Sequence, residues 1–202
     1  LDGRAFDRVR RRSYHAGSIL ALPLQLRVLA DALAGLDYAH RLTDFDGTPL
    51  HLVHRDVSPS NLFITFDGQV KLLDFGIAKT RDSSFETRVG VLMGMLSYMA
   101  PEQARGERVD ASADTFAVGV MLWEALTSRR LRNTQNDYEL LRSLTMEELP
   151  RASSVNPAVS PALDQICAKA LSARREDRYT TAAEFRAELE RAIEQTGLSA
   201  SH

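Results

Sequence analysis

Three polar residues of the kind that bind hard metal ions lie within one short, mostly apolar segment, LVHRDVSPSNLFITFDGQVKLLDFG. They are Asp56, Asn61 and Asp74. The residues between them include two apolar runs with branched side chains, Leu62–Thr65 and Val70–Leu73, which favour short strands. Because alternate residues of a strand must point inward, we expect the loop ends to bring the three side chains together. Carboxylate and amide oxygens suit Mg²⁺ rather than zinc, so the pattern predicts a magnesium site.

The elements that would position these residues are helices around one small β-hairpin. Asp67-Gly68 between the two apolar runs is a hairpin signal, and His51–His54 has the composition of a further short strand. Apolar residues recur at helical spacing from Pro23 to His40, and Asp114–Leu126 is apolar on nearly all sides, as in a helix buried within a domain. Further helices are expected over residues 4–15, 137–144, 161–171 and 182–195. The expected fold class is mainly α (α+β).

Composition and charge narrow the classes of protein. The 202 residues carry 25 Lys and Arg against 27 Asp and Glu, a net charge of −2 that gives no reason to expect nucleic acid as a partner. The single cysteine, Cys167, cannot form an internal disulfide and favours a reducing compartment. The longest apolar run, Phe116–Trp123, is far shorter than the roughly 20 residues that cross a bilayer, and no apolar leader opens the chain. We therefore expect a cytoplasmic protein without membrane contact.

Five motifs occur in a fixed order along nearly the whole chain. They are His54-Arg55-Asp56 with Asn61 five residues later, Asp74-Phe75-Gly76, Ala100-Pro101-Glu102, Asp114 with Gly119, and Arg178. In these motifs the sequence resembles the eukaryotic-type protein kinase family, closest to its bacterial Ser/Thr members. The resemblance implies that residues 1–196 form the C-terminal lobe of a kinase domain, a helical bundle whose β-hairpin insert carries the catalytic loop. Residues 74–102 would be the activation segment and 197–202 a frayed tail or the start of a linker.

The resemblance also implies a reaction, the transfer of a phosphoryl group from MgATP to Ser or Thr hydroxyls of a protein substrate. Asp56 would orient the proton of the attacking hydroxyl, and Asn61 and Asp74 would hold the Mg²⁺ ions that bridge the phosphates. Phe63 would form the floor of the adenine pocket, although an ordinary core aromatic residue has the same appearance in the sequence. Asp56, Arg55 and Ser58 are the candidate catalytic positions.

Other family features concern regulation and packing. Arg55 would bind a phosphate on the activation segment, with Thr87 preferred over Thr80, Ser83 and Ser84, although each can also be a solvated loop hydroxyl. Glu102 and Arg178 would form a buried ion pair. His54 and Phe75 would stack inside the lobe, which favours a core histidine over a general base. Cys167 lies among apolar helical neighbours and is expected to be buried and inert.

The sequence departs from the family in three respects. It contains no G-x-G-x-x-G, and Leu1 aligns near the end of the segment that joins the two lobes, so the N-terminal lobe with its flap and lysine is expected to be missing. The isolated chain would then bind ATP weakly and transfer negligibly. Ser58 also stands where Ser/Thr kinases usually carry a lysine, and Met95 where a threonine is common.

Three other functions fit parts of the pattern. The missing lobe and Ser58 favour a non-catalytic binding or scaffold module, whereas the retained Asp56, Asn61 and Asp74 oppose it. A small-molecule phosphotransferase could share these three residues, but the motifs around Glu102 and Arg178 argue against it. A DNA-binding role for the arginine-rich start lacks interleaved aromatic residues.

Overall fold

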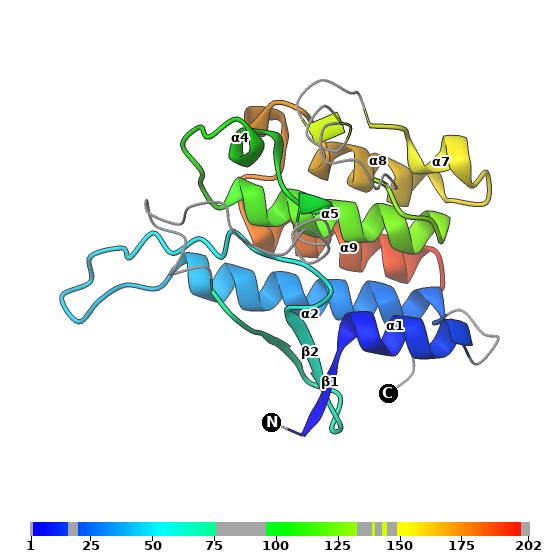
Figure 1. The fold of residues 1–202 in the computed structure, drawn as a ribbon, viewed down its shortest axis with the longest axis horizontal. Coiled ribbons are helices and arrows are strands. Elements are labelled where there is room, and N and C mark those ends of the chain that lie inside the picture. The colour runs from blue at the N-terminus through cyan, green and yellow to red at the C-terminus, as the bar shows by residue number, and fades with distance from the viewer. Residues whose placement is uncertain are drawn as a thin grey trace.

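The computed structural model describes residues 2–15, 20–75, 96–132, 139, 143–144 and 149–198 of the chain. Helices dominate, and a small sheet lies at one edge of the molecule (Figure 1). The helices are α1 (Phe6–His15), α2 (Leu22–His40), α4 (Pro101–Ala104), α5 (Ser112–Thr127), α7 (Ala152–Val155), α8 (Pro161–Ala170), α9 (Ala182–Gln195) and the 3₁₀ turn η2 (Arg175–Asp177). The strands are β1 (Gly3–Ala5), β2 (Leu62–Thr65) and β3 (Val70–Leu72). The mainly α (α+β) class is confirmed.

The core is built around α5, which lies between α2 on one side and α8 on the other (Figure 1). Every residue of α5 from Ala113 to Thr127 is buried, as its apolar sequence predicts. Gly119 permits the close approach of α8, since a Cβ at this position would lie 2.8 Å from the Cβ of Ala170. Helix α9 packs against both α2 and α8 and completes the bundle.

The predicted hairpin is confirmed. Strands β2 and β3 pair antiparallel, with Leu62 opposite Leu72, and the Thr65 N–H donates to Gln69 O across the turn. This turn contains Asp67-Gly68, the dipeptide that indicated it.

A third strand precedes α1, where the sequence predicted only helix. Gly3–Ala5 pairs antiparallel with β2, and the helix begins at Phe6. The pairing depends on Gly3, because a Cβ there would lie 2.3 Å from the carbonyl oxygen of Ile64. A close approach between segments so far apart in sequence leaves no periodic signal.

The strand predicted over His51–His54 is wrong. These residues are irregular, and His51 has a φ of 47° in the left-handed region. The backbone N–H of His54 donates to a side-chain carboxylate of α5 instead of a strand partner. Most of the helix predicted over residues 137–144 lies outside the described residues. Among the described helices, none combines the length and apolar character that a bilayer crossing requires.

Candidate active site

The loop that carries the candidate catalytic residues is held by one buried carboxylate, that of Asp114 in the first turn of α5. Its Oδ2 accepts the backbone N–H of His54 at 2.8 Å, and its Oδ1 accepts that of Arg55 at 2.8 Å. The Nε2 of His40, at the end of α2, lies 2.8 Å from Oδ2. Arg55 has a φ of 64°, a conformation that non-glycine residues rarely adopt. The carboxylate therefore partners two amides that an irregular backbone would otherwise leave unpaired.

Asp56 and Asn61 are in direct contact. The amide nitrogen Nδ2 of Asn61 donates to the carbonyl oxygen of Asp56 at 2.8 Å and to its carboxylate Oδ2 at 3.1 Å. The backbone N–H of Asn61 donates to Ser58 O at 3.0 Å, which closes a turn from Ser58 to Asn61. Because the nitrogen end of the amide is committed to Asp56, the oxygen end Oδ1 is the end available to a cation.

The strand end at residue 73 lies against the same loop. Leu73 donates its N–H to Asn61 O at 2.9 Å, and His54 Nε2 donates to Leu73 O at 2.9 Å. His54 Nδ1 in turn accepts the N–H of Asp56 at 3.3 Å, so the ring proton lies on Nε2. The His54 ring, fully buried, packs against Phe75 at 4.5 Å between centroids. These contacts confirm the interpretation of His54 as a core histidine.

Asp74 lies between Leu73 and Phe75, which contact Asn61 and His54 respectively. Asp74 is linked to Asn61 through the backbone of Leu73. Its side chain is exposed and its φ is 56°. Left-handed backbone at a non-glycine residue costs about 1 kcal/mol or more and is concentrated at functional sites. The structure thus joins Asp56 and Asn61 directly, and joins Asp74 to them through the backbone of Leu73.

The donor set fits Mg²⁺, with part of its coordination left to other ligands. In the described part of the chain no group of three or more His, Cys, Asp or Glu side chains is placed to hold a metal. Mg²⁺ is commonly bound by only one or two carboxylates together with substrate phosphates and waters. The amide oxygen of Asn61 and the carboxylate of Asp74 are donors of the kind that such a partial set uses.

The remaining predicted site residues are more dispersed. Ser58 is buried, with its hydroxyl 2.8 Å from that of Ser60, and it contacts Asn61 through its backbone carbonyl. Phe63 is partly buried on β2, in register with Lys71. Arg55 is exposed, and its carbonyl oxygen accepts from Gln103 Nε2 at 3.0 Å. The four candidate phosphate acceptors, Thr80, Ser83, Ser84 and Thr87, lie outside the described residues, as does Met95.

The predicted ion pair between Glu102 and Arg178 is confirmed. The guanidinium binds the carboxylate through two bonds, Nη1–Oε1 at 2.7 Å and Nη2–Oε2 at 2.9 Å, and the side chains are only 0% and 4% exposed. The Nε of Arg178 also donates to Ser172 O at 2.8 Å, and the guanidinium lies 4.7 Å from the centre of the Phe116 ring. This pair anchors α4 to the segment after η2.

Comparison with known proteins identifies the family. The model of the protein kinase domain matches residues 14–189. The chain belongs to the protein kinase family.

Relatives of the chain include protein kinases of bacteria. The chain is 47% identical over 94% of its length to the tyrosine-protein kinase MasK of Myxococcus xanthus, and 36% identical over 85% to the serine/threonine-protein kinase PknL of Mycobacterium tuberculosis. It spans 29% and 41% of those proteins. Among solved structures, the PknI kinase domain of Mycobacterium tuberculosis matches with a TM-score of 0.67 at 26% identity, over 95% of this chain and 62% of that one.

Two features of the kinase site were missed in the sequence. His40 ends a predicted helix, and nothing local relates it to Asp114, 74 residues later. Glu124 did leave a signal, since it is the single charged residue within the otherwise apolar stretch 116–126. Its Oε2 accepts from Tyr98 OH at 2.9 Å and from Arg10 Nη1 at 3.2 Å, so α5 is tied to α1 and to the segment before α4. Burial and the charge of Glu124 raise the pKa of Tyr98, which keeps its phenol protonated as the donor.

The hydrogen bonds that the Asp114 carboxylate accepts predict how the substitution Asp114→Asn will affect stability. An amide offers one acceptor oxygen where the carboxylate offers two, so one backbone N–H near His54 loses its partner. We expect the free energy of unfolding to fall by about 1–3 kcal/mol. The amide protons of His54 and Arg55 should also exchange faster with solvent. Hydrogen exchange followed by NMR measures both sites. Asp110→Asn is the matched control, since the exposed carboxylate of Asp110 accepts the N–H of Ser112 at the start of the same helix. Unchanged exchange at His54 and Arg55 would show that Asp114 does not hold the loop.

Proposed function

We propose that this chain supplies the catalytic loop and the magnesium ligands of a protein kinase that transfers the γ-phosphoryl group of ATP to a protein hydroxyl. The observation that carries the proposal is the contact between Asn61 and Asp56, in a loop whose backbone is held by Asp114. Phosphoryl transfer requires little covalent work from the protein and depends on alignment and charge neutralisation. A loop fixed at both its backbone and its side chains meets the first requirement.

Asp56 is the group that would orient the attacking hydroxyl. It is only partly buried, so a substrate can reach it, and one carboxylate oxygen accepts from Asn61. An anionic carboxylate at pH 7 can accept the O–H proton of a substrate and keep its oxygen in line with the phosphorus. The Nδ2 of Asn61 would orient this carboxylate.

Asn61 Oδ1 and the carboxylate of Asp74 would hold Mg²⁺. The ion, when bound, neutralises charge on the phosphate oxygens. The backbone position of Asp74 is set by its left-handed conformation and by the hydrogen bonds that link Leu73 to Asn61 and His54. These two side chains would give the ion one charged and one neutral oxygen ligand and leave its remaining positions to nucleotide phosphates and water.

The acceptor hydroxyls would be those of serine and threonine. The segment LSYMAPEQ before and within α4 is of the Ser/Thr type, and PknL bears that name, whereas MasK is named a tyrosine kinase. Ser58 provides no cation for the transferred group. Phosphoamino-acid analysis of a phosphorylated basic protein tests the assignment, and phosphotyrosine as its product would overturn it.

Residues 1–196 would form the C-terminal lobe of the kinase domain. In support, the match to PknI covers 95% of this chain but 62% of that domain, and no G-x-G-x-x-G occurs in the 202 residues. The isolated chain should then bind MgATP weakly, and calorimetry that shows micromolar affinity would contradict this assignment of the lobe. A cytoplasmic location remains a prediction from the single cysteine.

The metal site has its own test, independent of catalysis. Mn²⁺ can replace Mg²⁺ and broadens NMR signals of nearby nuclei even when it binds weakly. We expect broadening at the Asn61 side-chain amide and at the Asp74 backbone, and about a tenfold or greater loss of affinity in Asp74→Asn. Asp67→Asn is the control, because Asp67 is an exposed carboxylate in the hairpin turn. Equal broadening in Asp74→Asn and in the unaltered chain would remove Asp74 from the site.

A further inference from the structure

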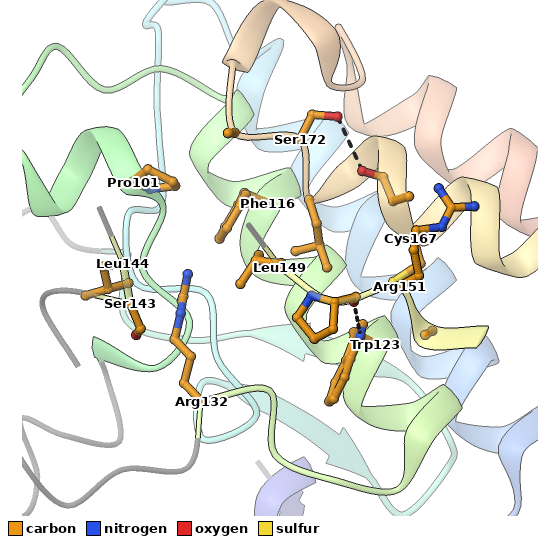
Figure 2. A pocket seen from close by; sticks show the side chains of 15 residues that line it. Pro101, Phe116, Trp123, Arg132, Ser143, Leu144, Leu149, Arg151, Cys167 and Ser172 are labelled. Atoms are coloured by element: carbon orange, nitrogen blue, oxygen red, sulfur yellow. Dashed lines mark hydrogen bonds between the residues drawn. The ribbon is translucent and has the colours of Figure 1, made fainter. Parts of the chain in front are cut away.

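A cavity of about 380 Å³ lies between α5, α8 and the segment that leads into α7, away from the candidate active site. Figure 2 shows Phe116 and Trp123 of α5, Cys167 of α8 and Leu149 around this space. Leu144 and Leu171 add further apolar surface. The walls therefore come from several elements of the bundle, and their inner surface is largely carbon.

Several polar groups of the wall are already engaged within the protein. The indole N–H of Trp123 donates to Pro150 O at 2.8 Å, and the hydroxyl of Ser172 donates to Ala168 O at 3.3 Å. The thiol of Cys167 lies 3.9 Å from Gly119 O, and burial raises its pKa so that it stays neutral. The guanidinium of Arg151 binds Asp164 at 2.8 Å. A molecule in the cavity thus meets walls that are mostly carbon and in which these polar groups have partners, which favours a largely apolar ligand.

We propose that this cavity is a binding site for a small apolar molecule, such as a short alkyl chain or a single aromatic ring. Its volume lies at the lower end of the range of about 300–1,000 Å³ found for ligand pockets. Apolar cavities less than half this size exclude water and bind benzene. A ligand in the cavity makes van der Waals contacts with the wall atoms, which have no such partners when the cavity is empty.

The site is connected to the segment that precedes α4. Pro101, the first residue of α4, lines the cavity, and so does Arg132. Arg132 Nη1 donates to Ser97 O at 2.8 Å and to Met99 O at 3.1 Å, and its guanidinium lies 5.6 Å from the centre of the Phe116 ring. A molecule bound in the cavity would contact the Phe116 ring and the Arg132 guanidinium. Because this guanidinium donates to the carbonyl oxygens of Ser97 and Met99, the bound molecule would affect the position of residues 97–101.

Fluorescence tests the proposal directly, because Trp123 is the single tryptophan of the chain. Titration with n-octanol should produce a saturable change in emission, and glycerol should produce none. Ala168→Phe places a ring at the cavity wall and should weaken the affinity for n-octanol at least tenfold. Ala162→Phe is the matched control, since Ala162 lies on the same helix but lines a separate groove between α8 and α9. A change in emission that does not saturate, or equal affinity in Ala168→Phe, would overturn the proposal.

A second measurement needs no substitution and covers the case in which Ala168→Phe fails to fold. Cys167 is the single cysteine, is 1% exposed and lines the cavity. Saturating n-octanol should slow its modification by a neutral thiol reagent several-fold under native conditions. An unchanged rate would place the octanol elsewhere and contradict the proposal.

Discussion

Replacement of Arg178 by alanine should lower the free energy of unfolding by about 3–5 kcal/mol, as expected when one partner of a buried ion pair is removed. The variant leaves the carboxylate of Glu102 buried at 4% exposure without the two guanidinium bonds that compensate its charge. It also removes the cation that contacts Phe116 and the donors to Ser172 O and Ala173 O. Urea unfolding followed by circular dichroism measures the loss.

Two further variants separate the stranded charge from other causes. Arg186→Ala breaks an exposed pair with Glu190 at 2.9 Å, four residues away on α9, and should cost only about 0.3–0.5 kcal/mol. The double variant Glu102→Leu/Arg178→Met removes both charges and should recover most of the loss, because hydrophobic replacement of a complete buried pair is often neutral. If Arg178→Ala proved as mild as Arg186→Ala, the pair would not anchor α4.

The elements that could be predicted from the sequence are those whose signal is local. The all-round apolar character of Asp114–Leu126 predicts the buried α5, and Asp67-Gly68 predicts the turn between β2 and β3. The burial of Cys167 follows from its apolar helical neighbours. In each case the residues that give the signal are the residues that form the structure.

The features that could not be predicted depend on partners far away in the chain. β1 forms because Gly3 can approach the backbone of Ile64, and the irregular segment 51–54 ends at His54, whose amide donates to Asp114 instead of to a strand partner. The ion pair of Glu102 and Arg178 was expected from the family resemblance alone, since no periodicity relates residues 76 positions apart. Of the candidate site, the contact between Asp56 and Asn61 follows from their short spacing, whereas the contribution of His40 does not.

The variant Asp56→Asn should lower kcat for transfer to a basic protein substrate by about 10²–10⁴-fold, in the range typical of a lost general base. The loop should keep its shape, because Asn61 Nδ2 donates to the backbone carbonyl of Asp56 at 2.8 Å and an asparagine at position 56 retains that carbonyl. The Asn61 side-chain amide signals in NMR spectra should therefore stay close to those of the unaltered protein, while the anionic proton acceptor is gone.

The assay uses residues 1–202 joined to a kinase N-terminal lobe, with MgATP, and Asp67→Asn serves as the control for loss of one negative charge at an exposed turn. Because Asp56→Asn keeps side-chain volume and an acceptor oxygen, a large fall in kcat with normal unfolding identifies the carboxylate charge as the cause. Retention of kcat within about tenfold would assign the hydroxyl proton to another acceptor. Absence of transfer by the unaltered protein would instead favour a kinase-like binding module, in which the contact between Asn61 and Asp56 only maintains the loop.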